Sequence, residues 1–378
     1  MRIGISCYPT YGGSGVVASE LALAMAEAGD DVHVVSYARP PRLVEERDRV
    51  HFHEVRVREY PLFEYPPYSL ALATKMVEVA KTYGLDVLHV HYAVPNAVSA
   101  VLARQMLAPR PLPVVTTLHG TDVTLIGNDP SYLETTRFGV VQSDEVTAVS
   151  EWLRLKTLEQ LGIEREISVI PNFVDPLRYR ADEERPVPAV RLLVHVSNFR
   201  RVKRAGDVVA IFAKVRARVP CRLLMVGDGP EREAAEAGVR SLGLEPAVEW
   251  LGNLDRVEDV LRSADLFLLP SRQESFGLAA LEALACGVPV VATRAGGLPE
   301  VVVDGECGAL REVGDVEGMA EAAIRLLEDH ELHRRYAAAG RRRALERFDR
   351  ARVVEQYREV YARAIARRGA ASPAGHEL

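Results

Sequence analysis

The sequence has few cysteines, no long apolar run and only a small excess of one charge sign, and each absence excludes a class of protein. Its four cysteines are scattered, with no C-x-x-C pair, at Cys7, Cys221, Cys286 and Cys307. This pattern favours reduced thiols in apolar cores over a disulfide framework or a zinc site. The formal net charge of −6 gives no general attraction to nucleic acid or to an anionic membrane.

No stretch is long and apolar enough to span a bilayer, and the chain begins directly with a strand-like run rather than with a signal peptide. We therefore expect a cytoplasmic protein without stable membrane association. Apolar residues make up 48% of the 378 residues, which is enough to build two cores. A chain of this length predicts two domains of about 150 to 200 residues each.

Short apolar runs alternate with amphipathic ones along both halves of the chain. The first half contains predicted strands at 3–7, 32–36, 50–55, 87–91, 114–118 and 146–149, with helical patterns between most of them. Such alternation is typical of parallel βαβ units. A polar segment at 175–188, with three prolines, marks the hinge, and the alternation restarts at 192–196. The sequence predicts an α/β protein with two doubly wound, Rossmann-like domains at 1–170 and 171–350, a C-terminal helix at 351–368 and a tail at 369–378.

One helical stretch in the second half contains a single charged residue. Between Phe276 and Cys286 every residue is apolar, small or glycine except Glu282. A helix that is apolar all round must be buried, and a buried carboxylate needs good hydrogen-bond donors. Those donors must come from another segment or from a ligand such as a sugar. Glu274 lies just upstream, at the carboxyl end of the predicted strand 266–269, where open α/β sheets bind ligands.

The two glutamates belong to a longer ordered string. Glu274 and Glu282 lie between a Pro-Ser strand end and a Gly-Val-Pro strand start, and Gly296-Gly297-Leu298-Pro299-Glu300 follows. This string resembles the donor signature of the retaining GT-B glycosyltransferases. The resemblance implies two domains facing a central cleft, with the last helix crossing back onto the first domain. It also implies that Glu274 binds the sugar hydroxyls, that Glu282 binds the ribose, and that Ser275, Phe276 and Gly277 contribute to the donor site.

A glycine-rich loop joins the first predicted strand to the first predicted helix. In Gly12-Gly13-Ser14-Gly15 the backbone amides and the helix N-terminus could cradle a phosphate group. Gly13, Gly15 and Ala18 also fit a dinucleotide fingerprint, although Val34 to Tyr37 provide no acidic residue to close the second strand. A glycine turn needed only for packing is a third interpretation. The GT-B resemblance implies that Gly13 faces the donor diphosphate.

A basic turn follows the first strand of the second domain. The run 197–204 contains four cations in five positions, which can neutralise the diphosphate of a leaving group without a metal ion. The resemblance assigns Lys203 to that diphosphate. The wider family often has an arginine at the position of Asn198, and we expect Arg200 to replace it in donor binding. Arg201 and Arg204 read better as solvated cations.

Three further positions follow from the same resemblance. Gly227 and Arg256, at later strand ends of the second domain, correspond to loops that wrap the nucleotide. His119 ends a strand of the first domain beside glycine, and the resemblance implies that it positions the donor sugar near its reacting carbon. It does not imply proton transfer by His119.

Several strings in the first domain resemble a narrower group, the N-acetylglucosaminyl L-malate synthases of bacillithiol biosynthesis. They include 7–15, 50–55, 65–68, 91–95 and 119–122, together with 195–200 in the second domain. The resemblance implies transfer of N-acetylglucosamine from UDP-N-acetylglucosamine to the hydroxyl of L-malate, with retention and without a metal or other cofactor. Since malate is a dianion, cationic and hydroxyl partners are expected, and the candidates are Ser14, Tyr92, Thr121, Arg137 and Lys75.

Other interpretations stay open at this point. The same fold could use another acceptor, such as an inositol phosphate or a lipid-linked sugar. A nucleotide-dependent oxidoreductase built on the first glycine-rich loop and a non-catalytic sugar-binding protein are more remote. No cluster of metal ligands emerges from the sequence, and the oligomeric state, including a homo-oligomer, is left open.

Overall fold

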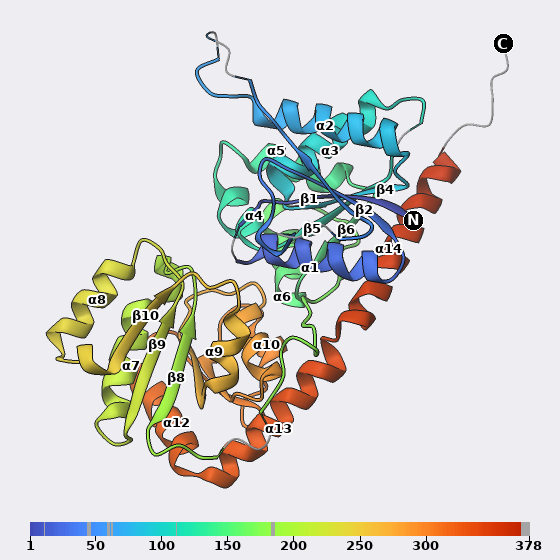
Figure 1. Ribbon diagram of the computed structural model, residues 1–378. Helices are drawn as coiled ribbons and strands as arrows, with labels where there is room; N and C mark the ends of the chain where they lie inside the picture. The colour runs from blue at the N-terminus through green and yellow to red at the C-terminus, as the bar shows by residue number, and fades with distance from the viewer. Residues whose placement is uncertain are drawn as a thin grey trace, which may run out of the picture. The chain divides into compact units, whose positions relative to one another are not determined.

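The computed structural model describes residues 1–10, 12–43, 47–58, 61, 63–110, 112–182 and 186–371 (Figure 1). The chain divides into two compact units, Met1–Pro171 with Ala351–Leu378, and Asn172–Arg350. The division falls just before the polar segment 175–188 in which we predicted the hinge. No helix in these described ranges has the length and apolar character needed to cross a membrane.

The first unit is built on a parallel sheet with the strand order β3-β2-β1-β4-β5-β6-β7 among the described residues. Its strands are β1 (Arg2–Ser6), β2 (Asp31–Ser36), β3 (Val50–Glu54), β4 (Val87–His91), β5 (Val114–Leu118), β6 (Glu145–Ala148) and β7 (Ser168–Val169). Its helices are α1 (Ser14–Glu27), α2 (Tyr68–Tyr83), α3 (Val98–Met106), α4 (Thr121–Thr124), α5 (Leu133–Gln142), α6 (Glu151–Leu161) and α14 (Arg350–Ala371). In Figure 1, α2, α3 and α5 lie together on one side of this sheet and α1 lies on the other.

The second unit repeats the design with the strand order β10-β9-β8-β11-β12-β13, again parallel throughout its described part. Its strands are β8 (Arg191–Val196), β9 (Cys221–Val226), β10 (Val248–Gly252), β11 (Leu266–Leu269), β12 (Val290–Thr293) and β13 (Gly308–Arg311). Its helices are α7 (Ala205–Arg216), α8 (Arg232–Ser241), α9 (Val257–Ser263), α10 (Leu278–Ala285), α11 (Leu298–Val301), α12 (Val316–Glu328) and α13 (His330–Arg347). The predicted pair of doubly wound α/β domains is confirmed.

The strand orders explain why short apolar runs were visible in the sequence. The central strands β1, β4, β5, β8 and β11 are buried almost throughout because helices cover both faces of each sheet. All four cysteines are free and buried, which confirms the prediction of reduced core thiols. Burial raises the pKa of the Cys7 thiol to about 12, so it stays protonated.

The C-terminal helix differs from its prediction. We expected a helix at 351–368 and a tail from 369, but α14 continues to Ala371, and 372–378 lie outside the described residues. The helix packs within the first unit, where the Tyr361 hydroxyl lies 2.8 Å from His89 Nδ1 and Arg358 pairs with Asp30 at 2.8 Å. Since Asp30 also binds the N-terminal ammonium group, α14 and the start of β1 are held by one carboxylate.

Each sheet has one point at which the strand order reverses direction, and this position determines where a ligand can bind. In the first unit it lies between β1 and β4, and in the second between β8 and β11. The loops that leave the carboxyl ends of two such strands diverge and form a crevice, which is the general ligand site of open α/β sheets. The loops in question begin at Cys7 and Tyr92 in the first unit, and at Ser197 and Pro270 in the second.

Candidate active site

The basic turn after β8 and the acidic loop after β11 meet in the second unit. Lys203 Nζ lies 2.6 Å from Glu274 Oε1, and both side chains are mostly buried. The Ser271 hydroxyl donates to the same carboxylate oxygen at 2.8 Å. The structure therefore brings together the predicted diphosphate-binding cation and the predicted sugar-binding carboxylate, which are far apart in sequence.

Glu274 is held in place by the glycines that follow β12. The Gly297 amide donates to the Glu274 carbonyl at 2.9 Å. A Cβ atom on Gly296 would lie 1.9 Å from that carbonyl oxygen, and the backbone there has φ +59°. Only glycine fits such a close approach. This contact gives a physical reason for the spacing between Glu274 and the Gly296-Gly297 pair.

Glu282 lies in α10 and is 7% exposed. The Tyr179 hydroxyl donates to Glu282 Oε1 at 2.6 Å, so the buried carboxylate has a donor from another segment. Tyr179 is itself buried, although it lies in the polar segment that we predicted to be a hinge. Sequence reasoning missed Tyr179 because a polar, proline-containing segment carries no signal for a buried hydroxyl.

The remaining predicted residues of the donor site have mixed surroundings. Asn198 and Arg200 are exposed after β8, and no carboxylate in the described part of the chain pairs with Arg200. A Cβ atom on Gly227 would lie 1.8 Å from the Ser197 carbonyl oxygen, which ties the β9 loop to the β8 loop. Arg256 is 71% exposed and pairs with Asp259 at 3.0 Å.

The string after Glu274 does not face solvent uniformly. The Phe276 ring is buried and packs edge to face against Phe348, with ring centroids 5.6 Å apart. Only the backbone of Phe276 can therefore face a ligand. Ser275 is partly exposed, whereas Gly277 is buried with φ +99°, immediately before α10. Asp228, which we regarded as an equally good helix cap, does not cap α8, since Glu231 occupies that position.

In the first unit, the β1–α1 loop presents an uncapped helix N-terminus. Gly13 precedes α1 with φ +59°, a conformation that favours glycine, and it brings no capping side chain. A Cβ atom on Gly15 would lie 2.5 Å from the Tyr8 carbonyl oxygen, so Gly15 is required for packing. Ser14, the first residue of α1, is 7% exposed, and Tyr11 lies outside the described residues. The first amides of α1 have the orientation that an anion requires.

His119 lies at the carboxyl end of β5 in a network of buried polar groups. Its Nε2 atom is 2.8 Å from His91 Nδ1, and burial lowers the pKa of His119 to about 3. The Asp122 carboxylate accepts hydrogen bonds from the amides of His119 and Gly120, at 3.2 and 2.8 Å from Oδ1. Burial raises the pKa of Asp122 to about 6. A neutral, fixed imidazole suits hydrogen bonding to a sugar hydroxyl rather than charge stabilisation.

Tyr92 and Thr121 lie beside His119. The rings of Tyr92 and His119 are stacked with centroids 5.9 Å apart, and Thr121 begins α4 directly after the His119-Gly120 turn. Tyr92 has φ +85°, which is rare for a side chain of this size. Backbone strain of this kind costs about 1–3 kcal/mol and occurs preferentially at functional sites. The structure therefore groups Tyr92, Thr121 and His119, but sequence reasoning did not anticipate the roles of His91 and Asp122.

The two candidate cations for the acceptor have structural partners. Arg137 Nε donates to the Leu161 carbonyl at the end of α6 at 2.8 Å, and its guanidinium lies 3.5 Å from Glu134. Lys75 pairs with Glu78 on the same helix at 2.7 Å. These contacts match the alternative interpretation, in which each cation belongs to the surface of its own helix.

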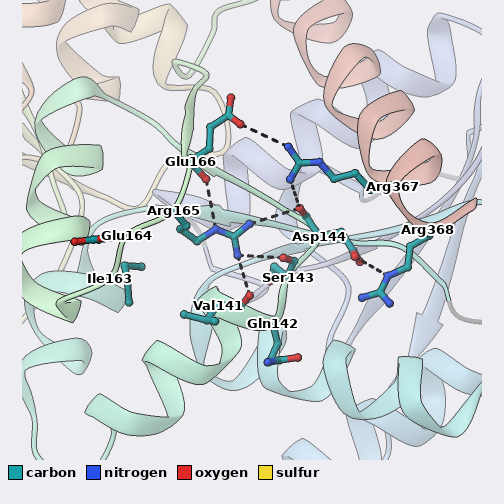
Figure 2. A pocket seen from close by; sticks show the side chains of 10 residues that line it. All are labelled: Val141, Gln142, Ser143, Asp144, Ile163, Glu164, Arg165, Glu166, Arg367 and Arg368. Atoms are coloured by element: carbon teal, nitrogen blue, oxygen red, sulfur yellow. Dashed lines mark hydrogen bonds and ion pairs between the residues drawn. The ribbon is translucent and has the colours of Figure 1, made fainter. Parts of the chain in front are cut away.

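A cavity of about 590 Å³ in the first unit lies away from these loops, as Figure 2 shows. It is formed before the amino end of β6 and by the last turns of α14. Its charged groups pair with one another, including Arg368 with Asp144 at 2.6 Å and Arg367 with Glu166 at 3.5 Å. Arg165 donates to the Val141 and Ser143 carbonyls. We attribute this cavity to the anchoring of α14 and not to the reaction.

Comparison with known proteins points in one direction. Residues 181–343 match the family described as "Glycosyl transferases group 1", and residues 11–178 match "Glycosyltransferase Family 4". The chain is 47% identical over 368 residues to N-acetyl-alpha-D-glucosaminyl L-malate synthase of Bacillus anthracis, with 96% of each chain covered.

Two solved structures share the fold. Anabaena Alr3699/HepE, in complex with UDP and glucose, matches with a TM-score of 0.81 at 21% identity, over 96% of this chain and 99% of that one. Sucrose-phosphate synthase from Thermosynechococcus elongatus matches with a TM-score of 0.79 at 23% identity, over 97% of this chain and 99% of that one. At these identities the likeness establishes the architecture of the chain.

Proposed function

The chain belongs to the GT-B glycosyltransferases, in the family that contains N-acetyl-alpha-D-glucosaminyl L-malate synthase, and we propose that it transfers N-acetylglucosamine from UDP-N-acetylglucosamine to L-malate. The products are the α-glucosaminide of malate and UDP, and the reaction is the first step of bacillithiol biosynthesis. The observation that carries the choice of acceptor is the 47% identity over 96% of both chains, which includes the acceptor-binding half. The nucleotide-dependent oxidoreductase is set aside because the family matches cover both halves of the chain.

The second unit supplies the residues that bind the donor. Lys203 can hold Glu274 and a phosphate oxygen at the same time, because an ammonium group has three N–H donors. With Arg200 it would stabilise the negative charge that grows on the diphosphate as the bond to the sugar breaks. Glu282 would bind the ribose hydroxyls, since a carboxylate accepts about four hydrogen bonds and Tyr179 uses one. Glu274 would bind the hydroxyls of the sugar.

The first unit supplies the acceptor residues and a further anion site. The N-terminus of α1 at Gly13 would face the diphosphate, and Ser14, Tyr92 and Thr121 would donate to the malate carboxylates. His119, neutral at physiological pH, would position the sugar. The assignments of Arg137 and Lys75 stay predictions, and so does the expected cytoplasmic location.

The transfer follows a front-face course in this proposal. The bond between the anomeric carbon and the diphosphate oxygen breaks, and a bond from the malate hydroxyl oxygen forms on the same face. The departing phosphate oxygen accepts the hydroxyl proton, so no protein base is required. We propose that Lys203, Arg200 and the α1 N-terminus provide the positive charge for this step without a metal ion.

The acceptor is tested by measuring UDP release from UDP-N-acetylglucosamine with L-malate, with an inositol phosphate and without acceptor. We expect UDP release to depend on malate. Activity with the inositol phosphate and none with malate would replace the acceptor while leaving the donor assignment intact. A parallel titration with NAD tests the oxidoreductase, for which tight NAD binding without binding of the UDP-sugar would be required.

A further inference from the structure

A cluster of imidazole and carboxylate side chains lies at the edge of the first unit's sheet. β3 is the edge strand, and its register with β2 pairs His33 with His51. Because side chains alternate along a strand, Asp31 lies on the same face of β2 as His33. Asp31 is the first residue of β2, so this cluster lies at the amino ends of the strands, at the opposite edge from the candidate active site.

The distances in the cluster are close to those of a metal site. Asp31 Oδ1 lies 2.9 Å from His51 Nε2, and Asp31 Oδ2 lies 3.6 Å from His33 Nε2. One ligand atom from each of the three residues lies within 4.8 Å of the others. Ligands at about 2.0–2.1 Å from a tetrahedral zinc ion are about 3.3 Å apart. The remaining adjustment is small for His51, whose side chain is 47% exposed.

His33 provides an independent indication of a missing ligand. Its side chain is fully buried, and within the described part of the chain its Nε2 atom has no hydrogen-bond partner. Its Nδ1 atom lies 3.0 Å from His53 Nε2. When the Nδ1 proton is donated to His53, the Nε2 lone pair lies opposite the Asp31 carboxylate, and two acceptors face each other. A cation between them satisfies both.

The surroundings keep the His33 ring in one orientation. Its ring stacks on that of His51 with centroids 4.8 Å apart and lies against Tyr83 with centroids 4.3 Å apart. Burial lowers the pKa of His33, which favours the neutral imidazole that a metal ion requires. The hydrogen bond to His53 has the form of an outer-shell contact, which fixes the ring and the tautomer of a ligating histidine.

We propose that Asp31, His33 and His51 bind one divalent transition-metal ion of the zinc type, with water in the remaining position. Imidazole and carboxylate ligands suit zinc, whereas magnesium prefers an all-oxygen octahedral site. The exposed side of Asp31 and His51 provides the entry path. The ion would join the edge strand β3 to β2, and its role is structural because the site is at the far edge from the reaction. This site was not predicted because its ligands meet only through the β2–β3 register.

The test uses the full chain without a histidine tag, treated with a chelator and then titrated with Zn²⁺ alone or Mg²⁺ alone by calorimetry. We expect one Zn²⁺ per chain, no Mg²⁺ binding, and a higher thermal unfolding midpoint with Zn²⁺. His51→Gln and Asp31→Asn should each weaken Zn²⁺ binding at least about 10-fold. His330→Gln, which removes an exposed imidazole of the second unit, is the matched control and should bind Zn²⁺ like the parent chain.

The readouts separate this proposal from the proposed function. Transferase activity should be unchanged in His51→Gln, because His51 is exposed and has no place in the donor or acceptor sites. The metal site is refuted when the parent chain binds no Zn²⁺, when His51→Gln and Asp31→Asn bind it as tightly as the parent, or when His330→Gln weakens binding equally. None of these results depends on the identity of the acceptor.

Discussion

Replacing Lys203 with alanine removes the cation that we assign to the leaving group. The side chain contacts Glu274 at 2.6 Å and lies in the turn Arg201–Lys203 after β8. One preorganised donor to a charge that develops in the transition state is worth about 2.7–4 kcal/mol. We therefore expect kcat to fall about 10²–10³-fold in Lys203→Ala, with a smaller rise in KM for the UDP-sugar.

The same change also affects the folded state, and the two effects must be separated. Glu274 would lose its cation but keep the hydrogen bond from Ser271, so we expect a loss of about 1–3 kcal/mol in the free energy of unfolding. Urea unfolding measures that loss. A second variant, Lys203→Arg, keeps the charge and should recover part of kcat while restoring most of the stability.

The chain offers a matched control two residues away. Arg201 lies in the same turn, is exposed, and carries the same charge. Arg201→Ala should leave kcat within about threefold of the parent, since exposed cations far from the reaction contribute little. The assay is malate-dependent UDP release over a range of donor concentrations. The reasoning is refuted when Lys203→Ala keeps parental kcat while folded, or when Arg201→Ala loses as much activity as Lys203→Ala.

Three further predictions follow from the described contacts. Glu282→Gln should raise KM for the UDP-sugar by about 10-fold or more, whereas Tyr179→Phe should lower stability by about 1–3 kcal/mol with a smaller effect on KM, and steady-state kinetics with urea unfolding would contradict this if the two effects were reversed. Gly296→Ala should disturb Glu274 and lower both stability and kcat, and a crystal structure with an unmoved Glu274 would contradict the reason given. Burial lowers the pKa of His89 from 6.5 to about 3, so the stability it contributes is complete above pH 6.5 and falls as the pH drops toward 3. At pH 5 the loss is about 2 kcal/mol relative to pH 7, and urea unfolding of His89→Gln should show a flatter pH dependence than the parent.

Much of the fold was predictable because its strands are apolar and its helices amphipathic. Parallel strands buried on both faces appear as short apolar runs, and glycine turns mark several of their ends. The C-terminal helix ends later than predicted because the residues at 369–371 carry no helix-stopping signal strong enough to override propagation from the preceding turns. The short strand β13 and the short helix α4 were not predicted, since four-residue elements carry little periodicity.

The candidate site was predictable where the sequence itself carried the chemistry. Glu282 stood out as the single charge in an apolar helix, and Lys203 and Glu274 followed strands that belong to one sheet edge. Tyr179 was not predictable, because only folding shows that its hydroxyl reaches Glu282. His91 was missed for a related reason, since its contact with His119 depends on the pairing of β4 with β5.

The central claim is that this chain joins N-acetylglucosamine to malate with retention at the anomeric carbon. It is tested most directly by incubating the purified chain with UDP-N-acetylglucosamine and L-malate, and analysing the product by mass spectrometry and proton NMR. We predict a product with the mass of N-acetylglucosaminyl malate and the small anomeric coupling of an α-glycoside. A large coupling, characteristic of the β-glycoside, would contradict retention, and UDP release without a malate adduct would contradict the acceptor.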